Sequence, residues 1–156
     1  MSITPFTDSG TIDAPALRRH LEFMAERGAG VFLGAINSGE GDLLSREELL
    51  TLYRTGVDAL AGVMPVFAAA SEPHSAQWIV DLAKEAADLG CQGTQLYPPR
   101  PASNPPPPAW EAEAERFYRQ VLEAARVPIF LCNYSHGGPG RVPTAMVVQL
   151  VSEYPH

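Results

Sequence analysis

Four short apolar runs constrain the fold of this chain more than any other feature. They occupy residues 31–36, 65–70, 93–97 and 128–133 and recur at intervals of roughly 30 residues, the length of a βα unit. Each run is followed by Gly, Ser, Pro or Asn, which is typical of a strand buried on both faces. Because helical patterns separate the runs, the sequence predicts parallel βαβ units, an α/β fold with a parallel sheet.

Capping residues mark where the intervening helices begin. Asp13 and Ser75 each precede an amphipathic pattern and can accept a hydrogen bond from the first turn. Ser45 and Glu48 have the spacing of a capping box, in which side chains and backbone amides are paired reciprocally. Pro143 fits the first turn of the last helix, where a backbone N–H has no intrahelical partner.

Two architectures have this element order, the doubly wound open sheet and the (β/α)8 barrel. No Gly-rich dinucleotide-binding motif follows a strand, and polar and Gly-rich residues recur where strands end, as in a barrel active site. A complete barrel needs about 250 residues, whereas this chain has 156. We therefore predict one domain, residues 1–156: an incomplete (β/α)8 TIM barrel of about five βα units. The alternative is a doubly wound binding domain.

Composition excludes several classes of partner. The formal net charge is −7 and no basic stripe occurs, so nucleic acids and anionic membranes are poor partners. The two cysteines, Cys91 and Cys132, are too widely spaced for a disulfide framework. The N-terminus lacks the pattern of a signal peptide, and no apolar stretch approaches the roughly 20 residues of a membrane span. We expect a reduced, cytoplasmic protein.

Three motifs occur in order along the chain. Residues 4–7 read Thr-Pro-Phe-Thr, and residues 33–41 read Leu-Gly-Ala-Ile-Asn-Ser-Gly-Glu-Gly. Residues 128–133 read Pro-Ile-Phe-Leu-Cys-Asn. Together they resemble the dihydrodipicolinate synthase / N-acetylneuraminate lyase family, with its Thr-Pro-Phe opening, Gly-Thr-Thr-Gly-Glu loop and Pro-Ile-x-Leu-Tyr-Asn strand. The resemblance implies a TIM barrel in which the segment through Phe6 is the first strand and the four apolar runs follow it.

The resemblance also implies a reaction. Members of this family hold pyruvate or another 2-oxo acid as a Schiff base on a lysine, and the iminium makes the adjacent carbon a nucleophilic enamine. Asn37 and Ser38 take the paired threonine positions of the family loop, and with Gly39 they are the predicted carboxylate-binding residues. From the residues alone, the loop is also an ordinary βα turn before a capped helix. The implied partner is a small-molecule 2-oxo acid, and neither a cofactor nor a metal is expected.

Three more site residues are predicted. Cys132 stands where the family strand has its proton-shuttling tyrosine, although a free cysteine is more often a small buried side chain. Tyr134 lies on the same face of the strand and is the second candidate for the catalytic hydroxyl. Arg141 resembles the family arginine that can bind a substrate carboxylate through two hydrogen bonds, and an exposed arginine is the alternative.

The only lysine of the chain, Lys84, lies in a helical pattern. Helices form the outer ring of a barrel, away from the catalytic face, so we expect Lys84 on the surface. The family's Schiff-base lysine sits near the end of strand six, several residues beyond residue 156. We therefore expect a chain that is truncated before strand six, lacks this lysine and is inactive by itself.

A non-catalytic role is the alternative. An open parallel sheet has unpaired strand edges, which proteins tend to pair or cover. A half-barrel would then self-associate or bind a complementary fragment. For the same reason we expect a homo-oligomer.

Overall fold

Four parallel strands and five helices form the described part of this protein. The computed structural model describes residues 1–36, 38–70, 75–99, 106–133 and 142–156. The strands are β1 Val31–Leu33, β2 Val66–Ala70, β3 Gly93–Leu96 and β4 Ile129–Leu131. The helices are α1 Ala14–Ala25, α2 Arg46–Leu60, α3 Ala76–Asp88, α4 Pro107–Ala125 and α5 Thr144–Glu153. Each strand lies within one of the four predicted apolar runs.

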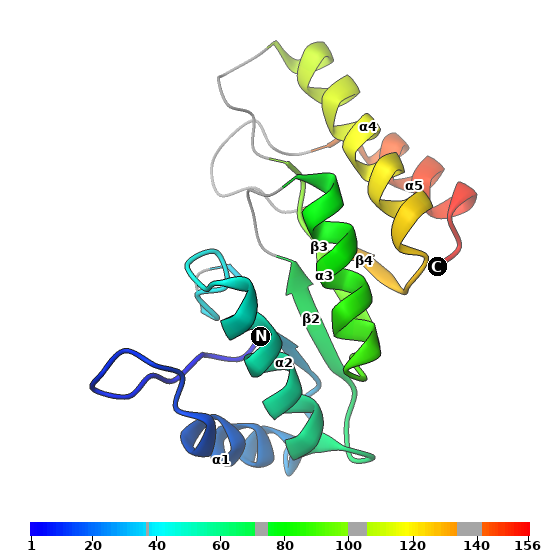
Figure 1. The fold of residues 1–156 in the computed structure, drawn as a ribbon. Helices are drawn as coiled ribbons and strands as arrows, with labels where there is room; N and C mark the ends of the chain where they lie inside the picture. Colours follow the sequence, from blue (N-terminus) through cyan, green and yellow to red (C-terminus); the bar gives the residue numbers. More distant parts are fainter. Residues whose placement is uncertain (37, 71–74, 100–105, 134–141) are drawn as a thin grey trace.

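The strands pair in chain order, β1-β2-β3-β4, and each pair is parallel. A doubly wound sheet reverses its strand order at a switch point, so that alternative was wrong. Parallel crossovers are right-handed, which places consecutive helices on the same face of the sheet. Figure 1 shows α2, α3 and α4 side by side along this face. The described fold is a partial (β/α) barrel.

The two faces of the sheet differ in what covers them. Val31, Leu33 and Val66 point toward the helices and belong to the main core, with exposures of 0%, 0% and 2%. On the opposite face, alternate positions carry Phe32 and Phe67, which are register partners. This second face corresponds to the inside of a barrel, and the site lies at one end of it.

The N-terminal segment differs from the strand that the resemblance implied. Phe6 forms an isolated antiparallel bridge with Ile12 instead of joining the parallel sheet. The Thr7 N–H donates to the Thr11 carbonyl at 2.8 Å and closes a turn, and Pro5 has no N–H for a ladder. One bond to the sheet is formed, from the Ser2 N–H to the Phe32 carbonyl at 3.0 Å. The segment therefore lies beside β1 without extending the sheet.

The three predicted side-chain caps are confirmed, whereas Pro143 is the residue before α5 and not part of its first turn. Asp13 accepts a hydrogen bond from the Ala16 N–H at 2.9 Å, and Ser75 caps α3 through the Trp78 N–H at 3.2 Å. The box at the start of α2 is complete: Glu48 accepts from the Ser45 N–H at 2.8 Å, while the Ser45 hydroxyl accepts from the Glu48 N–H. These bonds satisfy N–H groups that a helix leaves unpaired at its start.

The capping box predicts a pH dependence of stability. Hydrogen bonds from the Ser45 side chain and backbone lower the pKa of Glu48. Because the folded pKa lies below the unfolded one, this stabilisation is complete above the unfolded pKa and is lost as pH falls through the folded pKa. We expect Glu48→Gln to lower the free energy of unfolding by about 0.5–1 kcal/mol at pH 7. Urea titrations at pH 7 and pH 3 measure this difference.

A neighbouring glutamate provides the control for that measurement. Glu47 lies in the same turn, is exposed, and forms no hydrogen bond or ion pair with any described residue. Glu47→Gln should therefore change stability less than Glu48→Gln at pH 7. An effect of Glu48→Gln that is equally large at pH 3 would contradict the role of the Glu48 charge.

Candidate functional site

A small buried cluster marks the edge of the sheet where the strands end. Ala35 follows β1, Ala69 is near the end of β2 and Tyr97 follows β3, and all three are buried. Ile36 and Cys132, the latter from the residue after β4, pack against them. In parallel barrels, this C-terminal edge is the one that carries active sites. The cluster therefore brings together residues from all four strand ends.

The loop after β1 is a tight turn fixed by its own backbone. The N–H groups of Gly39 and Gly41 both donate to the Ala35 carbonyl, at 3.1 and 3.3 Å, and the Ser38 N–H donates to the Ile36 carbonyl at 3.0 Å. The Thr4 hydroxyl donates to the Gly39 carbonyl at 2.7 Å and attaches the N-terminal segment to the loop. The amides of Ser38 and Gly39, two of the residues predicted to bind a carboxylate, are therefore already used inside the turn.

The Ser38 hydroxyl is a polar group that the described part of the turn leaves available. Ser38 is exposed, and its side chain forms no hydrogen bond with any described residue. Gly39 is buried, and a Cβ at this position would lie 2.6 Å from the Ala35 nitrogen. Only glycine therefore permits the backbone approach that presents Ser38. The neighbouring predicted residue, Asn37, lies outside the described residues.

Tyr97 joins the candidate site, although no sequence motif singled it out. Its side chain is 6% exposed, and its hydroxyl donates to Gln95 Oε1 at 3.2 Å. Burial and then the nearby Cys132 thiol raise the pKa of Tyr97 to about 12, while a backbone hydrogen bond from Ile36 lowers it. The phenol therefore stays protonated at neutral pH. Its position at the end of the run 93–97 was the available signal.

Cys132 lies where the sequence predicted, at the end of β4. Its N–H donates to the Leu96 carbonyl at 2.8 Å, and its side chain is partly buried against the cluster. The next residue, Asn133, forms two hydrogen bonds with the backbone of Val142, at 2.9 and 3.0 Å. Residues 134–141, with the predicted Tyr134 and Arg141, lie outside the described residues.

An aromatic floor lies on the same face of the sheet as the site. The rings of Phe32, Phe67 and Phe130 contact one another with centroid distances of 4.9, 4.9 and 5.5 Å. Gly93 makes room for this cluster, since a Cβ there would lie 2.8 Å from Phe130 Cε2. Gln95 is one position further along the barrel-facing row of β3 and is 8% exposed. The polar groups of the site thus stand above an apolar base.

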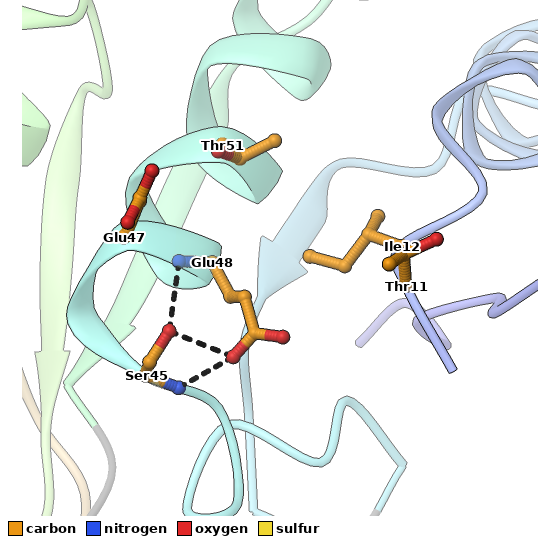
Figure 2. Close-up of a pocket in the computed structure, with 6 residues that line it drawn as sticks. All are labelled: Thr11, Ile12, Ser45, Glu47, Glu48 and Thr51. Carbon is orange, nitrogen blue, oxygen red and sulfur yellow. Dashed lines mark hydrogen bonds between the residues drawn. The ribbon is translucent and has the colours of Figure 1, made fainter. Parts of the chain in front are cut away.

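A groove near the start of α2 does not match this site. It has a volume of about 440 Å³ and is lined by Thr11, Ile12, Ser45, Glu47, Glu48 and Thr51. Figure 2 shows Ser45 and Glu48 bonded to each other within it. The groove contains none of the predicted site residues, and its two carboxylates would repel a 2-oxo acid.

Lysine and metal chemistry have no support in the described residues. Lys84 lies in α3 and is exposed, as predicted. Among the residues that the structure describes, no group of three or more His, Cys, Asp or Glu side chains could hold a metal ion. In the same part of the chain, no helix is long and apolar enough to cross a membrane.

Fold and site together define a partial (β/α) barrel with its candidate site at the C-terminal ends of the strands. The model of the Dihydrodipicolinate synthetase family matches residues 1–153, and the chain belongs to this family. It is 30% identical to the 4-hydroxy-tetrahydrodipicolinate synthase of Chlorobaculum parvum, over 99% of this chain and 49% of that protein. A DapA-like lyase of Thermococcus kodakarensis is 29% identical over 98% of this chain and 50% of its own length.

Solved structures show the same fold. The DHDPS of Cyanidioschyzon merolae superposes with a TM-score of 0.84 at 25% identity, covering 98% of this chain and 50% of that one. YagE of Escherichia coli K12, solved in complex with pyruvate, superposes with a TM-score of 0.85 at 23% identity, covering 98% and 49%. The chain spans about half the length of the relatives that it matches.

Proposed function

We propose that this chain forms the substrate-binding part of a lyase that acts on pyruvate or a similar 2-oxo acid through a lysine Schiff base in the complete protein. The observation that carries the proposal is the cluster in which the ends of all four strands bring the Ser38 loop, Tyr97 and Cys132 together. Membership of the Dihydrodipicolinate synthetase family supports the reaction class. In this proposal, the Ser38 hydroxyl binds the carboxylate of the 2-oxo acid, and Arg141 assists it.

The same proposal places the Schiff-base lysine outside the 156 residues. Lys84 is exposed on α3, which belongs to the outer helical layer, so its amine does not face the site. The chain by itself is then inactive and binds the 2-oxo acid without a covalent bond. The protein uses neither a cofactor nor a metal, and the free state of both cysteines supports a cytoplasmic location.

Pyruvate binding tests the proposal. We expect ligand-observed NMR to detect pyruvate bound to the 156-residue chain, and Ser38→Ala to weaken binding about 5- to 10-fold because one hydrogen bond to a charged group is lost. Ser152→Ala is the matched control, since Ser152 lies in α5 and its hydroxyl donates to the Val148 carbonyl. A parent chain that does not bind pyruvate would sink the proposal.

Borohydride reduction tests the covalent half of the proposal. Because Lys84 does not face the site, treatment with pyruvate and borohydride should leave the intact mass of this chain unchanged. An adduct located on Lys84 by peptide mapping would show that the chain carries its own Schiff-base lysine. In that case the placement of the lysine outside the chain is wrong.

Self-association is the second candidate role, and one surface favours it. Phe130 is 43% exposed on the barrel-facing side of β4, where it contacts Phe32 and Phe67. An apolar side chain of this size at the edge of an open sheet is a common protein contact. If two copies pair through this face, gel filtration should show a concentration-dependent dimer that Phe130→Ser weakens. A parent chain that remains monomeric at all concentrations would exclude this role.

A further inference from the structure

Tyr97 is held at the site by a hydrogen bond and by packing. Its hydroxyl donates to Gln95 Oε1 at 3.2 Å, and both residues lie on the barrel-facing row of β3 and its end. Ile36, from the loop after β1, packs against the buried cluster that contains Tyr97. The hydroxyl is thus bonded to its own strand, and the ring lies beside the loop that follows β1.

Cys132 occupies the neighbouring position on β4. Its N–H pairs with Leu96, the residue before Tyr97, and the Cys132 side chain packs against the cluster that contains Tyr97. A tyrosine at position 132, which the family motif has, would put a second ring beside the Tyr97 ring, because the two positions follow paired residues of β3 and β4. Because buried sites are close-packed, two tyrosine rings would compete for this space.

We propose that Tyr97 supplies the hydroxyl of this site, donating a hydrogen bond to an oxygen of the bound 2-oxo acid, in place of a tyrosine at position 132. The proposal rests on the proposed function and assigns the role to neither Cys132 nor Tyr134. Gln95 is a positioning residue, because it touches Tyr97 and is itself 8% exposed. Gln95 orients the hydroxyl before the ligand binds, and a ligand oxygen then takes the place of Gln95 Oε1 as the acceptor.

The protonation state agrees with a donor. The pKa of Tyr97 is raised to about 12, mainly by burial, so the phenol keeps its proton across the physiological range. A protonated phenol at the edge of a partly dry cluster can donate to a carboxylate or carbonyl oxygen, and it does not need a metal or a second base for this. The Phe32, Phe67 and Phe130 rings form the apolar floor of the same face.

Pyruvate affinity of the full 156-residue chain tests the donor role. We expect Tyr97→Phe to weaken pyruvate binding about tenfold in ligand-observed NMR, because the ring stays and only the hydroxyl is lost. Tyr154→Phe is the matched control, since that hydroxyl donates to Glu123 at 2.8 Å in an exposed position. Tyr97→Phe that binds pyruvate as tightly as the parent overturns the donor role. If the parent binds no pyruvate, the proposed function fails instead.

A second measurement, made without ligand, tests whether a tyrosine at position 132 competes for space with Tyr97. We expect Cys132→Tyr alone to lower the midpoint of thermal unfolding, since two tyrosine rings must share one space. The double variant Tyr97→Cys with Cys132→Tyr conserves the total side-chain volume and should recover most of the loss. The idea that the two tyrosines compete for one space is overturned if Cys132→Tyr is as stable as the parent. It is also overturned if the double variant is less stable than the sum of the two single-variant effects predicts.

Discussion

Gly39→Ala is expected to abolish pyruvate binding and to lower the free energy of unfolding by about 2–3 kcal/mol. A Cβ at this position would lie 2.6 Å from the Ala35 nitrogen and 2.9 Å from the Ala35 oxygen. Both atoms belong to the backbone, so the loop has to move to accept the methyl group. The movement breaks the bonds from the Gly39 N–H to Ala35 and from Thr4 to the Gly39 carbonyl.

A second glycine separates this steric effect from the general effect of adding a methyl group. At Gly30 the nearest atom to an added Cβ is Pro65 Cγ at 4.0 Å, which is ordinary contact. Gly30→Ala should therefore leave stability and pyruvate binding unchanged, or raise stability slightly by restricting the unfolded chain. Urea unfolding and ligand-observed NMR give both quantities. If Gly39→Ala changes stability and pyruvate binding no more than Gly30→Ala does, the loop has room for a methyl group and its shape is not required for binding.

Local patterns predicted most of the fold because each depends on a few neighbouring residues. The apolar runs predicted all four described strands, and Ser45 with Glu48 predicted a capping box that the structure contains. The order of the strands within the sheet did not follow from the sequence, and it is this order that separates a barrel from a doubly wound sheet. Side chains alternate along a strand and caps act within one turn, so the sequence alone carries this information.

The site was less predictable because its residues meet only through the sheet. Tyr97 and Cys132 are 35 positions apart, and the parallel pairing of β3 with β4 brings them together. Ser38 and Gly39 were predicted to bind a carboxylate, yet the amides of both residues are used within the loop. The Tyr97–Cys132 contact and the hydrogen bonds inside the turn do not follow from the spacing of residues in the sequence. Both depend on how far each strand extends before the backbone turns. Asn37, Tyr134 and Arg141 remain predictions.

Tyr53 connects the outer helices to the ends of two strands. Its side chain is 0% exposed, and its hydroxyl donates to the Ala69 carbonyl at 2.9 Å. The hydroxyl would also lie 3.4 Å from a Cβ added at Gly34, the residue after β1. Burial raises the pKa of Tyr53, so the hydroxyl is a neutral donor. Through its bond to Ala69, this side chain supports the base of the cluster that contains Tyr97, and it fills the space beside Gly34.

Tyr53→Ala should lower the free energy of unfolding by about 3–5 kcal/mol, the range for removing a buried aromatic ring. Tyr53→Phe should lose about 1 kcal/mol, the contribution of one buried hydrogen bond. Leu60→Ala is the matched control, because Leu60 is 1% exposed at the other end of α2. Leu60→Ala should lower the free energy of unfolding but leave the pyruvate affinity of the folded protein unchanged. Tyr53→Ala should lower both quantities. Equal binding by the folded forms of Tyr53→Ala and Leu60→Ala would show that Tyr53 stabilises the core but does not position the site.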